Sequence, residues 1–361
     1  MFIVESYAVA IIMCFITMIC WGSWANTTKL VSNKKWEFPL FYWDYSIGLL
    51  LCSLLFAFTL GSMGEAGRSF IPDIQQASSS SLMSAILAGI IFNISNILLV
   101  ASINLAGMAV AFPVGVGLAL PLGVITTYIG NPQGDPLILF LGVACVVIAI
   151  IFTAIAYGRV TQEADKSRRN KGLITAILAG IIMGWFFRFL ADSMSDNFSQ
   201  PASGLMTPYS ALVLFAVGLF LSNFVLNTLV MKKPISGEPV NGKMYFSGSL
   251  RDHVCGWLGG MIWCVGLAFS LIASGQAGYA ISYGLGQGAT MIAVIWGVFI
   301  WREFASAPAG TNKLLLTMFI SYIVGIVLII GTISNSSQVY RNQLKARILR
   351  FLARILSPVI N

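Results

Sequence analysis

The sequence predicts an all-α polytopic membrane protein with ten transmembrane helices. Only 9% of its 361 residues are charged and 57% are hydrophobic, whereas a soluble domain carries about 25% charged residues. The stretches from Tyr7 to Asn26, Leu137 to Ala156 and Leu314 to Ile333 contain no Asp, Glu, Lys or Arg. Each is about 20 residues long, which is the length that a helix needs to cross the hydrocarbon of a bilayer. These observations exclude a water-soluble fold.

Charged or Pro/Gly-rich breaks divide the chain into ten apolar spans. We expect the spans at residues 7–29, 40–61, 83–104, 106–129, 137–158, 172–192, 208–230, 253–273, 277–301 and 314–334. No basic cluster precedes the first span, which continues to full spanning length, so we expect a membrane helix and not a cleaved signal peptide. The gaps leave no room for a soluble domain, so function must lie among the helices or on short loops.

Ten spans divide into two sets of five, and a repeated five-helix unit must insert the opposite way round the second time. The sequence supports this plan, because residues 106–117 align without gaps with residues 277–288, about half the chain later. We therefore expect two inverted five-helix repeats. The predicted parts are a first repeat at 1–158, a short basic central loop at 159–171, a second repeat at 172–334 and a basic amphipathic C-terminal helix at 335–361.

Positive charge is distributed unevenly among the loops. The loops after the first, fifth, seventh and ninth spans hold nearly all the loop Lys and Arg, and the opposite loops hold only Arg68. Because short cytoplasmic loops are enriched in these residues, we expect an external N-terminus. Ten spans would put the basic tail outside too, so either the tail is an exported surface helix or the count is off by one. The net charge of +8 fits contact with anionic membrane lipid, and we expect no binding of nucleic acid.

The end of the first span combines indole rings with hydrogen-bonding groups, at Trp21, Trp24 and Asn26. Polar residues inside a membrane are costly, so each is a candidate for lining a cavity. Such a surface suits a neutral planar or ring-shaped solute, and an interfacial aromatic belt is the alternative for the tryptophans. Asn93 in the third span is another candidate substrate ligand, although it can instead hydrogen-bond between helices.

Glycine and proline mark the fourth and ninth spans as deformable. The candidate positions are Pro113, Gly115, Gly117, Gly284 and Gly288. If these helices bend or part, the candidate substrate-binding residues of the ninth span come to lie on a cavity wall. They are Tyr279, Tyr283 and Gln287. Close helix contacts through glycine are the alternative.

Few ionisable residues lie within the spans. Asp44 follows an aromatic run at the start of the second span, where a partly buried carboxylate can load and release a proton. Asp44 is therefore our candidate for proton coupling or for a hydrogen bond to the substrate, with a helix cap or a headgroup contact as the alternative. Arg188 stands four residues before Asp192, which favours an ion pair on one helix face. We expect His253 to be an interfacial loop residue.

The six cysteines lie in or beside apolar runs, and no pair has the spacing of a metal or redox site. A zinc site would also need more histidine partners than the single one present. We therefore expect no metal and no cofactor.

Several motifs occur in one order along the chain. They are Val4-Glu5-Ser6, Trp21-Gly22-Ser23-Trp24, Asp44-Tyr45-Ser46, Thr59-x-Gly61-x-x-Gly64, Gln276-Ala277-Gly278-Tyr279-Ala280 and Trp296-Gly297 with Glu303 after it. On these motifs the chain resembles the ureide permease family of the drug/metabolite transporter superfamily and, more distantly, its bacterial glucose/ribose uptake branch. The resemblance is ordered over the first four and last three spans and weak between them.

The resemblance implies import of a small neutral polar solute, either a sugar such as ribose or glucose or a ureide or nucleobase such as allantoin or uracil. It implies a proton gradient as the driving force, and a sodium ion could replace the proton because carbonyl groups freed at Gly and Pro can coordinate one. Plant members of the family have a long central loop, whereas residues 159–171 are short and basic. We therefore expect a protein of the bacterial inner membrane, either a monomer or a homodimer.

Two other functions stay open. A multidrug or metabolite exporter of the same superfamily would need an intramembrane acid deeper than Asp44 to move cations, and the sequence shows none. An intramembrane enzyme would need paired catalytic groups, and we expect no His/Asp, His/Cys or paired-carboxylate cluster in the spans. We therefore expect a transporter and not an enzyme.

Overall fold

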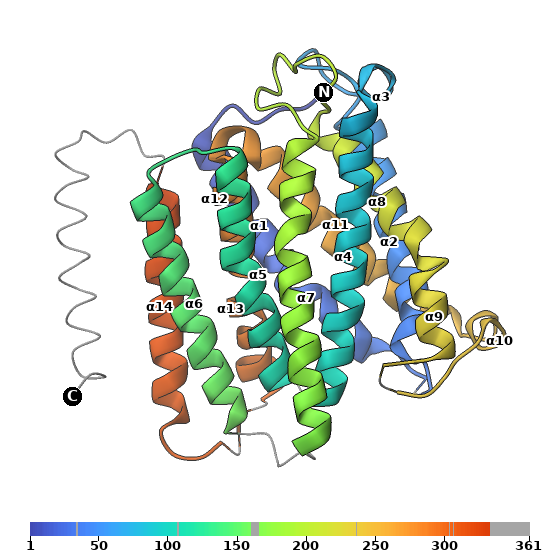
Figure 1. The fold of residues 1–361 in the computed structure, drawn as a ribbon, viewed down its shortest axis with the longest axis vertical. Helices are drawn as coiled ribbons and strands as arrows, with labels where there is room; N and C mark the ends of the chain where they lie inside the picture. The colour runs from blue at the N-terminus through green and yellow to red at the C-terminus, as the bar shows by residue number, and fades with distance from the viewer. Residues whose placement is uncertain are drawn as a thin grey trace.

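The computed structural model describes residues 1–33, 35–106, 108–159, 166–235, 237–302, 304–305 and 307–332. Within these residues every named element is a helix (Figure 1). The predicted C-terminal helix at 335–361, and residues 160–165 of the central loop, lie outside the described residues. The all-α class predicted from the sequence is confirmed.

The helices follow one another with short connections. The α-helices are α1 Tyr7–Ser23, α2 Phe38–Phe58, α3 Phe70–Gln76, α4 Ser79–Ala106, α5 Met108–Gly130, α6 Pro136–Gly158, α7 Lys166–Asp192, α8 Pro208–Asn223, α9 Leu226–Lys232, α10 Gly242–Phe246, α11 Leu250–Ala277, α12 Tyr279–Gly286, α13 Ala289–Ile295 and α14 Thr311–Gly331. Two irregular segments accompany them, the 3₁₀-helix η1 at Trp24–Leu30 and the π-helix η2 at Trp296–Ile300.

Nine helical segments among the described residues are long and apolar enough to cross a membrane. They coincide with nine of the ten predicted spans and differ from them by a few residues at the ends. The fourth predicted span coincides with α5, in which Val114–Gly130 forms a shorter apolar helix. A polytopic membrane protein is therefore confirmed, whereas the count of ten and the two inverted repeats stay predictions.

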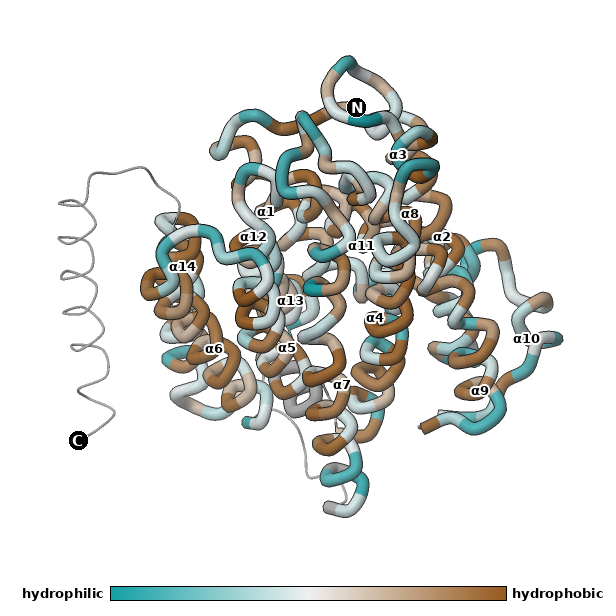
Figure 2. Tube along the Cα trace, turned by 45° about the horizontal axis from the view of Figure 1, so that its top comes forward, coloured by the Kyte–Doolittle hydropathy of each residue, from teal (hydrophilic) through white to brown (hydrophobic). Residues whose placement is uncertain are grey.

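The helices pack in close pairs because small residues let their backbones approach. Helix α4 packs on α7 and α8, α2 on α11, and α6 on α14. Where α6 meets α14, a Cβ atom added to Gly142 would lie 2.9 Å from the carbonyl oxygen of Gly325. Such close contacts hold helices together in a membrane, where the hydrophobic effect does not. Hydrophilic residues gather at the two ends of the bundle and in the loops (Figure 2).

Three spans are not continuous α-helices. The span Tyr7–Leu30 changes from α1 into η1 at Trp24, and the span Pro208–Lys232 is divided into α8 and α9 at Phe224 and Val225. The span Tyr279–Ile300 consists of α12, α13 and η2, with a break at Gln287 and Gly288. Gly278, whose φ of +83° suits glycine, separates this span from α11. Broken helices occur at membrane depth only where protein surrounds them or where they line a cavity.

The two ends of the bundle differ in charge. One end, which we call the basic face, holds the connections after η1, α6, α9 and η2 (Figure 1). The described Lys and Arg residues of these connections are Lys35, Arg159, Lys233 and Arg302, and Lys243 lies in α10, which follows the third of them. The N-terminal amino group lies at the other end and donates to the carbonyl oxygens of Gly64 and Ala66. The positive-inside rule predicts that the basic face is cytoplasmic.

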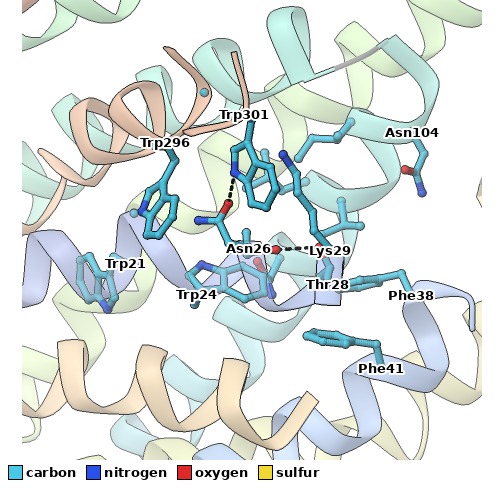
Figure 3. A pocket seen from close by; sticks show the side chains of 18 of the residues that line it. Trp21, Trp24, Asn26, Thr28, Lys29, Phe38, Phe41, Asn104, Trp296 and Trp301 are labelled. Carbon is cyan, nitrogen blue, oxygen red and sulfur yellow. Dashed lines mark hydrogen bonds between the residues drawn. The ribbon is translucent and has the colours of Figure 1, made fainter. Parts of the chain in front are cut away.

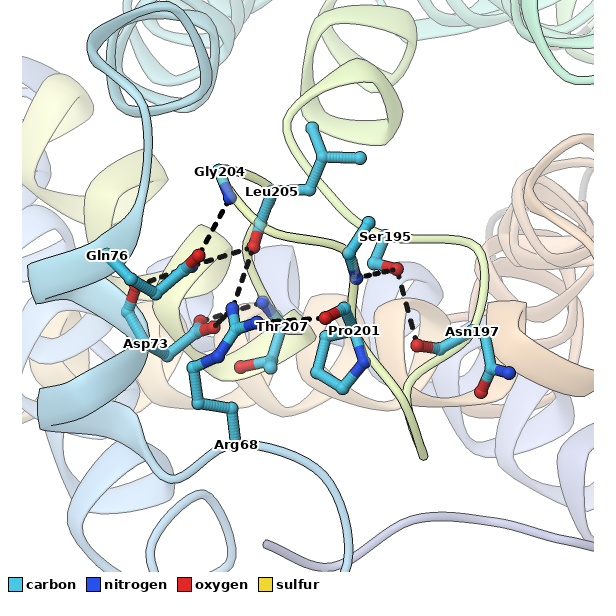
Figure 4. Close-up of polar contacts among 10 residues, drawn as sticks. Arg68, Asp73, Gln76, Ser195, Asn197, Pro201, Gly204, Leu205 and Thr207 are labelled. Atoms are coloured by element: carbon cyan, nitrogen blue, oxygen red, sulfur yellow. Dashed lines mark hydrogen bonds and ion pairs between the residues drawn. The ribbon is translucent and has the colours of Figure 1, made fainter.

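At the other end, residues 62–78 and 193–207 join into a structure that we call the outer cap (Figure 4). The fully buried carboxylate of Asp73 accepts hydrogen bonds from Arg68 Nη1 at 2.9 Å and from the backbone N–H of Thr207 at 2.8 Å. Arg68 also donates to two backbone carbonyl oxygens of the second segment. The guanidinium group therefore fastens two segments that are distant in the sequence.

Candidate functional site

A cavity of about 370 Å³ lies between η1, the start of α2, α4, α6, α13 and η2. Its lining is rich in aromatic side chains, namely Trp21, Trp24, Trp36, Phe38, Phe41, Tyr157, Trp296 and Trp301. Polar groups stand between them, at Asn26, Thr28, Lys29, Glu37, Asn96, Asn104, Thr153 and Thr290. Apolar walls with a few placed polar groups are typical of small-molecule sites.

The cavity opens toward the basic face. Its lining extends from Trp21 and Thr290, inside the bundle, to Glu37 at a helix end that borders the basic loops. Its described lining contains no residue of the outer cap. At that end, the hydroxyl of Tyr279 in α12 donates to the carbonyl oxygen of Ser195 at 2.9 Å, which ties the broken span to the outer cap. Among the described residues, this cavity therefore opens on the basic face and does not reach the outer cap.

Hydrogen bonds hold the residues in and beside η1 against the residues in and beside η2 along the cavity. Trp296 Nε1 donates to Ser23 Oγ, at the end of α1, at 2.9 Å. Trp301 Nε1, just after η2, donates to Asn26 Oδ1 at 2.7 Å (Figure 3). The ammonium group of Lys29 lies 4.2 Å from the centroid of the Trp301 ring, a cation–π contact. Because π-helical segments are frequent at functional sites, the meeting of these two irregular segments makes this cavity the candidate functional site.

Other aromatic rings support the tryptophan walls from behind. Trp21 stacks on Trp263 with ring centroids 5.7 Å apart. Trp24 packs on Tyr45 at 5.0 Å. Rings held in this way lose little conformational entropy when a solute packs against them, so the walls are preformed for a flat or ring-shaped molecule.

Three of the predicted substrate-binding residues, Trp21, Trp24 and Asn26, line the cavity. Asn93 does not line the cavity. Its Nδ2 donates to a serine hydroxyl of α8 at 2.7 Å, which is the hydrogen bond between helices that the sequence left as the alternative. Asn96, nearly one turn further along α4, lines the cavity. The local sequence could not separate the two asparagines, since both lie in the same apolar run.

The predicted ligands of the ninth span lie apart from this cavity. The hydroxyl of Tyr283 donates to the carbonyl oxygen of Ala119 at 3.2 Å, and Tyr279 bonds to the outer cap. Gln287 lies buried at the break between α12 and α13. The structure does not bring these three side chains together with Trp24, and their part in substrate binding stays a prediction.

The glycines predicted to allow bending face neighbouring helices. Side chains of other helices lie beside Gly115, Gly117 and Gly284, as close packing requires. Gly288 stands at the break before α13. The side chain of Pro113 lies outside the described residues. Movement at these five positions stays a prediction.

Asp44 is fully buried, at the contact between α2 and α11. Its Oδ1 accepts a hydrogen bond from the Tyr245 hydroxyl at 2.7 Å, and its Oδ2 lies 2.8 Å from His253 Nδ1. The expectation that His253 is a loop residue is therefore wrong, because it lies in the first turn of α11. The expectation of no His/Asp pair is also wrong, because this turn carries the ring to the carboxylate. Burial, and the hydrogen bond to Asp44, raise the pKa of Tyr245 above its ordinary value, so its hydroxyl remains a donor at neutral pH.

The predicted ion pair of α7 is confirmed. Arg188 Nε lies 2.8 Å from Asp192 Oδ2, and both side chains are partly exposed. Neither residue belongs to the described cavity lining. This pair is therefore structural and not part of the candidate site.

Comparison with known proteins identifies the family. Residues 41–172 and 159–332 match the Ureide permease family. Ureide permease 1 of Arabidopsis thaliana is 22% identical over 389 residues, which cover 92% of this chain and 99% of that protein. The Glucose uptake protein GlcU of Bacillus subtilis is 23% identical over 253 residues, which cover 68% of this chain and 75% of that protein.

The fold is also similar to that of a protein with a solved crystal structure. The two align with a TM-score of 0.54 and 14% sequence identity over 90% of this chain and 98% of the other, a likeness that concerns the fold alone. The family match extends over more than half of the chain, and these two relatives are named as transport proteins, not as enzymes. The chain is therefore a multi-pass membrane permease that belongs to the ureide permease family.

Proposed function

We propose that the protein is a secondary-active importer of a small neutral polar solute in a bacterial inner membrane, where it works as a monomer or a homodimer. The observation that carries this proposal is the aromatic-walled cavity, which opens on the basic face and ends short of the outer cap. A cavity that opens on one face of the bundle fits alternating access. The short connection between α6 and α7 supports a bacterial origin.

The walls of the cavity favour an uncharged substrate. Lys29 and Glu37 are the charged residues of its described lining, and their opposite signs provide no net attraction for an ion. Asparagine and threonine side chains supply donors and acceptors, and the indole rings supply flat apolar surfaces that stack on rings. A sugar such as ribose or glucose, or a ureide or nucleobase such as allantoin or uracil, has this combination of a compact ring and hydrogen-bonding edges.

The relatives support both substrate kinds and the direction of transport. One relative is named a ureide permease and another a glucose uptake protein. If the basic face is cytoplasmic, the cavity in this structure faces the cytoplasm, which is the state from which an importer releases its substrate. An exporter would load its substrate from the same state, so the direction that we propose, import, rests on the relative that is named a glucose uptake protein.

We further propose that protons drive accumulation through Asp44. A buried carboxylate that is not a structural partner of Lys or Arg suits this role, and Asp44 bonds instead to a phenol and an imidazole. It lies outside the cavity lining, so a proton and a neutral solute would occupy separate sites.

Uptake into proteoliposomes tests the proposal. Radiolabelled ribose, glucose, allantoin and uracil should be compared with and without an imposed pH gradient, and at least one should accumulate when the gradient is present. Proton-driven efflux of a dye, with no uptake of any of the four solutes, would establish an exporter instead.

A matched pair of variants on α4 assigns the site. Asn96→Ala removes an amide from the cavity lining and should raise the KM for the transported solute. Asn93→Ala removes the same group from a contact with α8 and should lower stability without raising KM. An unchanged KM in Asn96→Ala together with a raised KM in Asn93→Ala would move the binding site away from this cavity.

A further inference from the structure

The environment of Asp44 contains a second proton-binding group. Its two carboxylate oxygens have separate partners, the Tyr245 hydroxyl on one and His253 Nδ1 on the other. The helices touch here, since a Cβ atom added to Gly256 would lie 2.4 Å from Asp44 Cβ. The carboxylate is fully buried and the imidazole side chain is 18% exposed, so the ring stands between Asp44 and the surface.

We propose that Asp44 and His253 bind and release the driving proton as one unit, and that Trp36 transmits the state of this unit to the cavity. This inference rests on the proposed proton-coupled import and names the residues that perform it. When the imidazole is protonated, it forms a neutral pair with the Asp44 carboxylate. When the imidazole is neutral, the unit carries one negative charge, which burial in a membrane protein disfavours.

The geometry gives each ring nitrogen a distinct role. Nδ1 faces Asp44, whereas Nε2 faces the connection between α10 and α11, where a Cβ atom added to Gly248 would lie 2.9 Å away. This connection belongs to the same end of the bundle as the basic loops. Loss of the Nε2 proton toward that end leaves a neutral imidazole whose Nδ1–H still donates to Asp44, so the proton leaves without breaking the pair.

The neighbouring ionisable groups are already engaged elsewhere. Arg251 Nε donates to the carbonyl oxygen of Leu30 at 3.2 Å, and the Asp252 carboxylate bonds to Ser32 and Ser249. On the side of α10, Tyr245 presents a phenol with a raised pKa, which supplies a hydrogen bond but no charge. Among these described groups, the Asp44–His253 unit is therefore the one that remains to bind the proton.

Trp36 connects this unit with the cavity. Its ring lines the cavity, meets His253 edge-on with centroids 5.0 Å apart, and stacks on Tyr245 at 6.0 Å. Because one indole contacts both the proton-binding unit and the cavity space, a change in the charge of His253 acts on the cavity wall. This contact is the physical link between the proton and the solute.

The test separates coupling from binding in the full-length protein. In proteoliposomes, His253→Gln should lose the solute accumulation that a pH gradient drives but should retain solute counterflow at equal pH. We also expect solute import by wild type to acidify the vesicle lumen, and His253→Gln should lose this acidification. Arg251→Gln is the matched control, because it removes a charge two residues away that bonds to the backbone of η1. It should accumulate solute as wild type does.

Tyr245→Phe provides a second readout if His253→Gln fails to fold. Removing a donor from the carboxylate makes proton uptake easier, so the pH of half-maximal accumulation should move upward. Gradient-driven accumulation by His253→Gln at the wild-type level, or an unchanged pH profile in Tyr245→Phe, would overturn the inference. Failure of wild type to transport any of the four solutes would instead overturn the proposed function.

Discussion

Breaking the Arg68–Asp73 ion pair should destabilise the protein more than the loss of a surface ion pair would. Asp73 is fully buried and the Arg68 side chain is 22% exposed. Arg68→Met therefore leaves an unpaired carboxylate inside the outer cap. Removing one partner of a buried pair costs about 3–5 kcal/mol. Because water reaches part of the Arg68 side chain, we expect the lower end of this range, about 3 kcal/mol.

Unfolding in mixed micelles with increasing SDS, followed by circular dichroism, measures this cost. Glu65→Gln removes an exposed charge from the same segment and should change the unfolding free energy by less than about 0.5 kcal/mol. The double variant Arg68→Met/Asp73→Asn should recover part of the loss, because it leaves no buried charge. A cost of less than about 1 kcal/mol in Arg68→Met, as for exposed pairs, would show that water reaches Asp73 and would refute this reasoning.

Three further predictions concern the cavity helices and α7. A Cβ atom on Gly22 would lie 2.5 Å from the carbonyl oxygen of Ala289. Gly22→Val should therefore push α1 away from α13, cost about 1–3 kcal/mol of stability and abolish solute counterflow. Counterflow at the wild-type level in this variant would contradict the packing. Trp301→Phe removes the hydrogen bond to Asn26 and should change the counterflow KM by up to about tenfold, the equivalent of one hydrogen bond; an unchanged KM would show that this bond does not shape the site. Asp192→Asn breaks an ion pair whose carboxylate is 42% exposed and should cost less than about 1 kcal/mol in SDS unfolding; a larger cost would show that the pair is effectively buried.

The membrane class could be predicted because it depends on composition and on the length of apolar runs. The helix ends could not be placed as well. Helix α11 begins at Leu250, three residues before the predicted start, because the Ser249 side chain and the Asp252 carboxylate form a capping box. In the sequence, Arg251 and Asp252 suggest a loop, whereas in the structure this carboxylate stabilises the first turn.

Part of the cavity follows from local sequence and part does not. The cluster Trp21, Trp24 and Asn26 lies within one short segment, so its polarity inside an apolar span predicted a cavity wall. The facing wall, which includes Thr290 and Trp296, depends on the helix break and on the π-helix, which hydrophobic periodicity does not reveal.

The Asp44–His253 pair could not be predicted from spacing. The two residues belong to α2 and α11, and only the packing of these helices brings them within 2.8 Å. The sequence does indicate that Asp44 is unusual, because a carboxylate among apolar residues needs a partner. The identity of that partner is a tertiary property.

The central claim is that the solute binds among the indole rings of the cavity, and the apparent affinity of solute uptake in proteoliposomes tests it most directly. Trp24→Ala removes a cavity wall, whereas Trp185→Ala removes an indole that is 46% exposed on the outside of α7. Ring stacking contributes about 0.5–1.5 kcal/mol beyond the area that it buries. We therefore predict that Trp24→Ala weakens the apparent affinity by about tenfold or more and that Trp185→Ala leaves it unchanged. Equal affinities in wild type and both variants would contradict binding in this cavity.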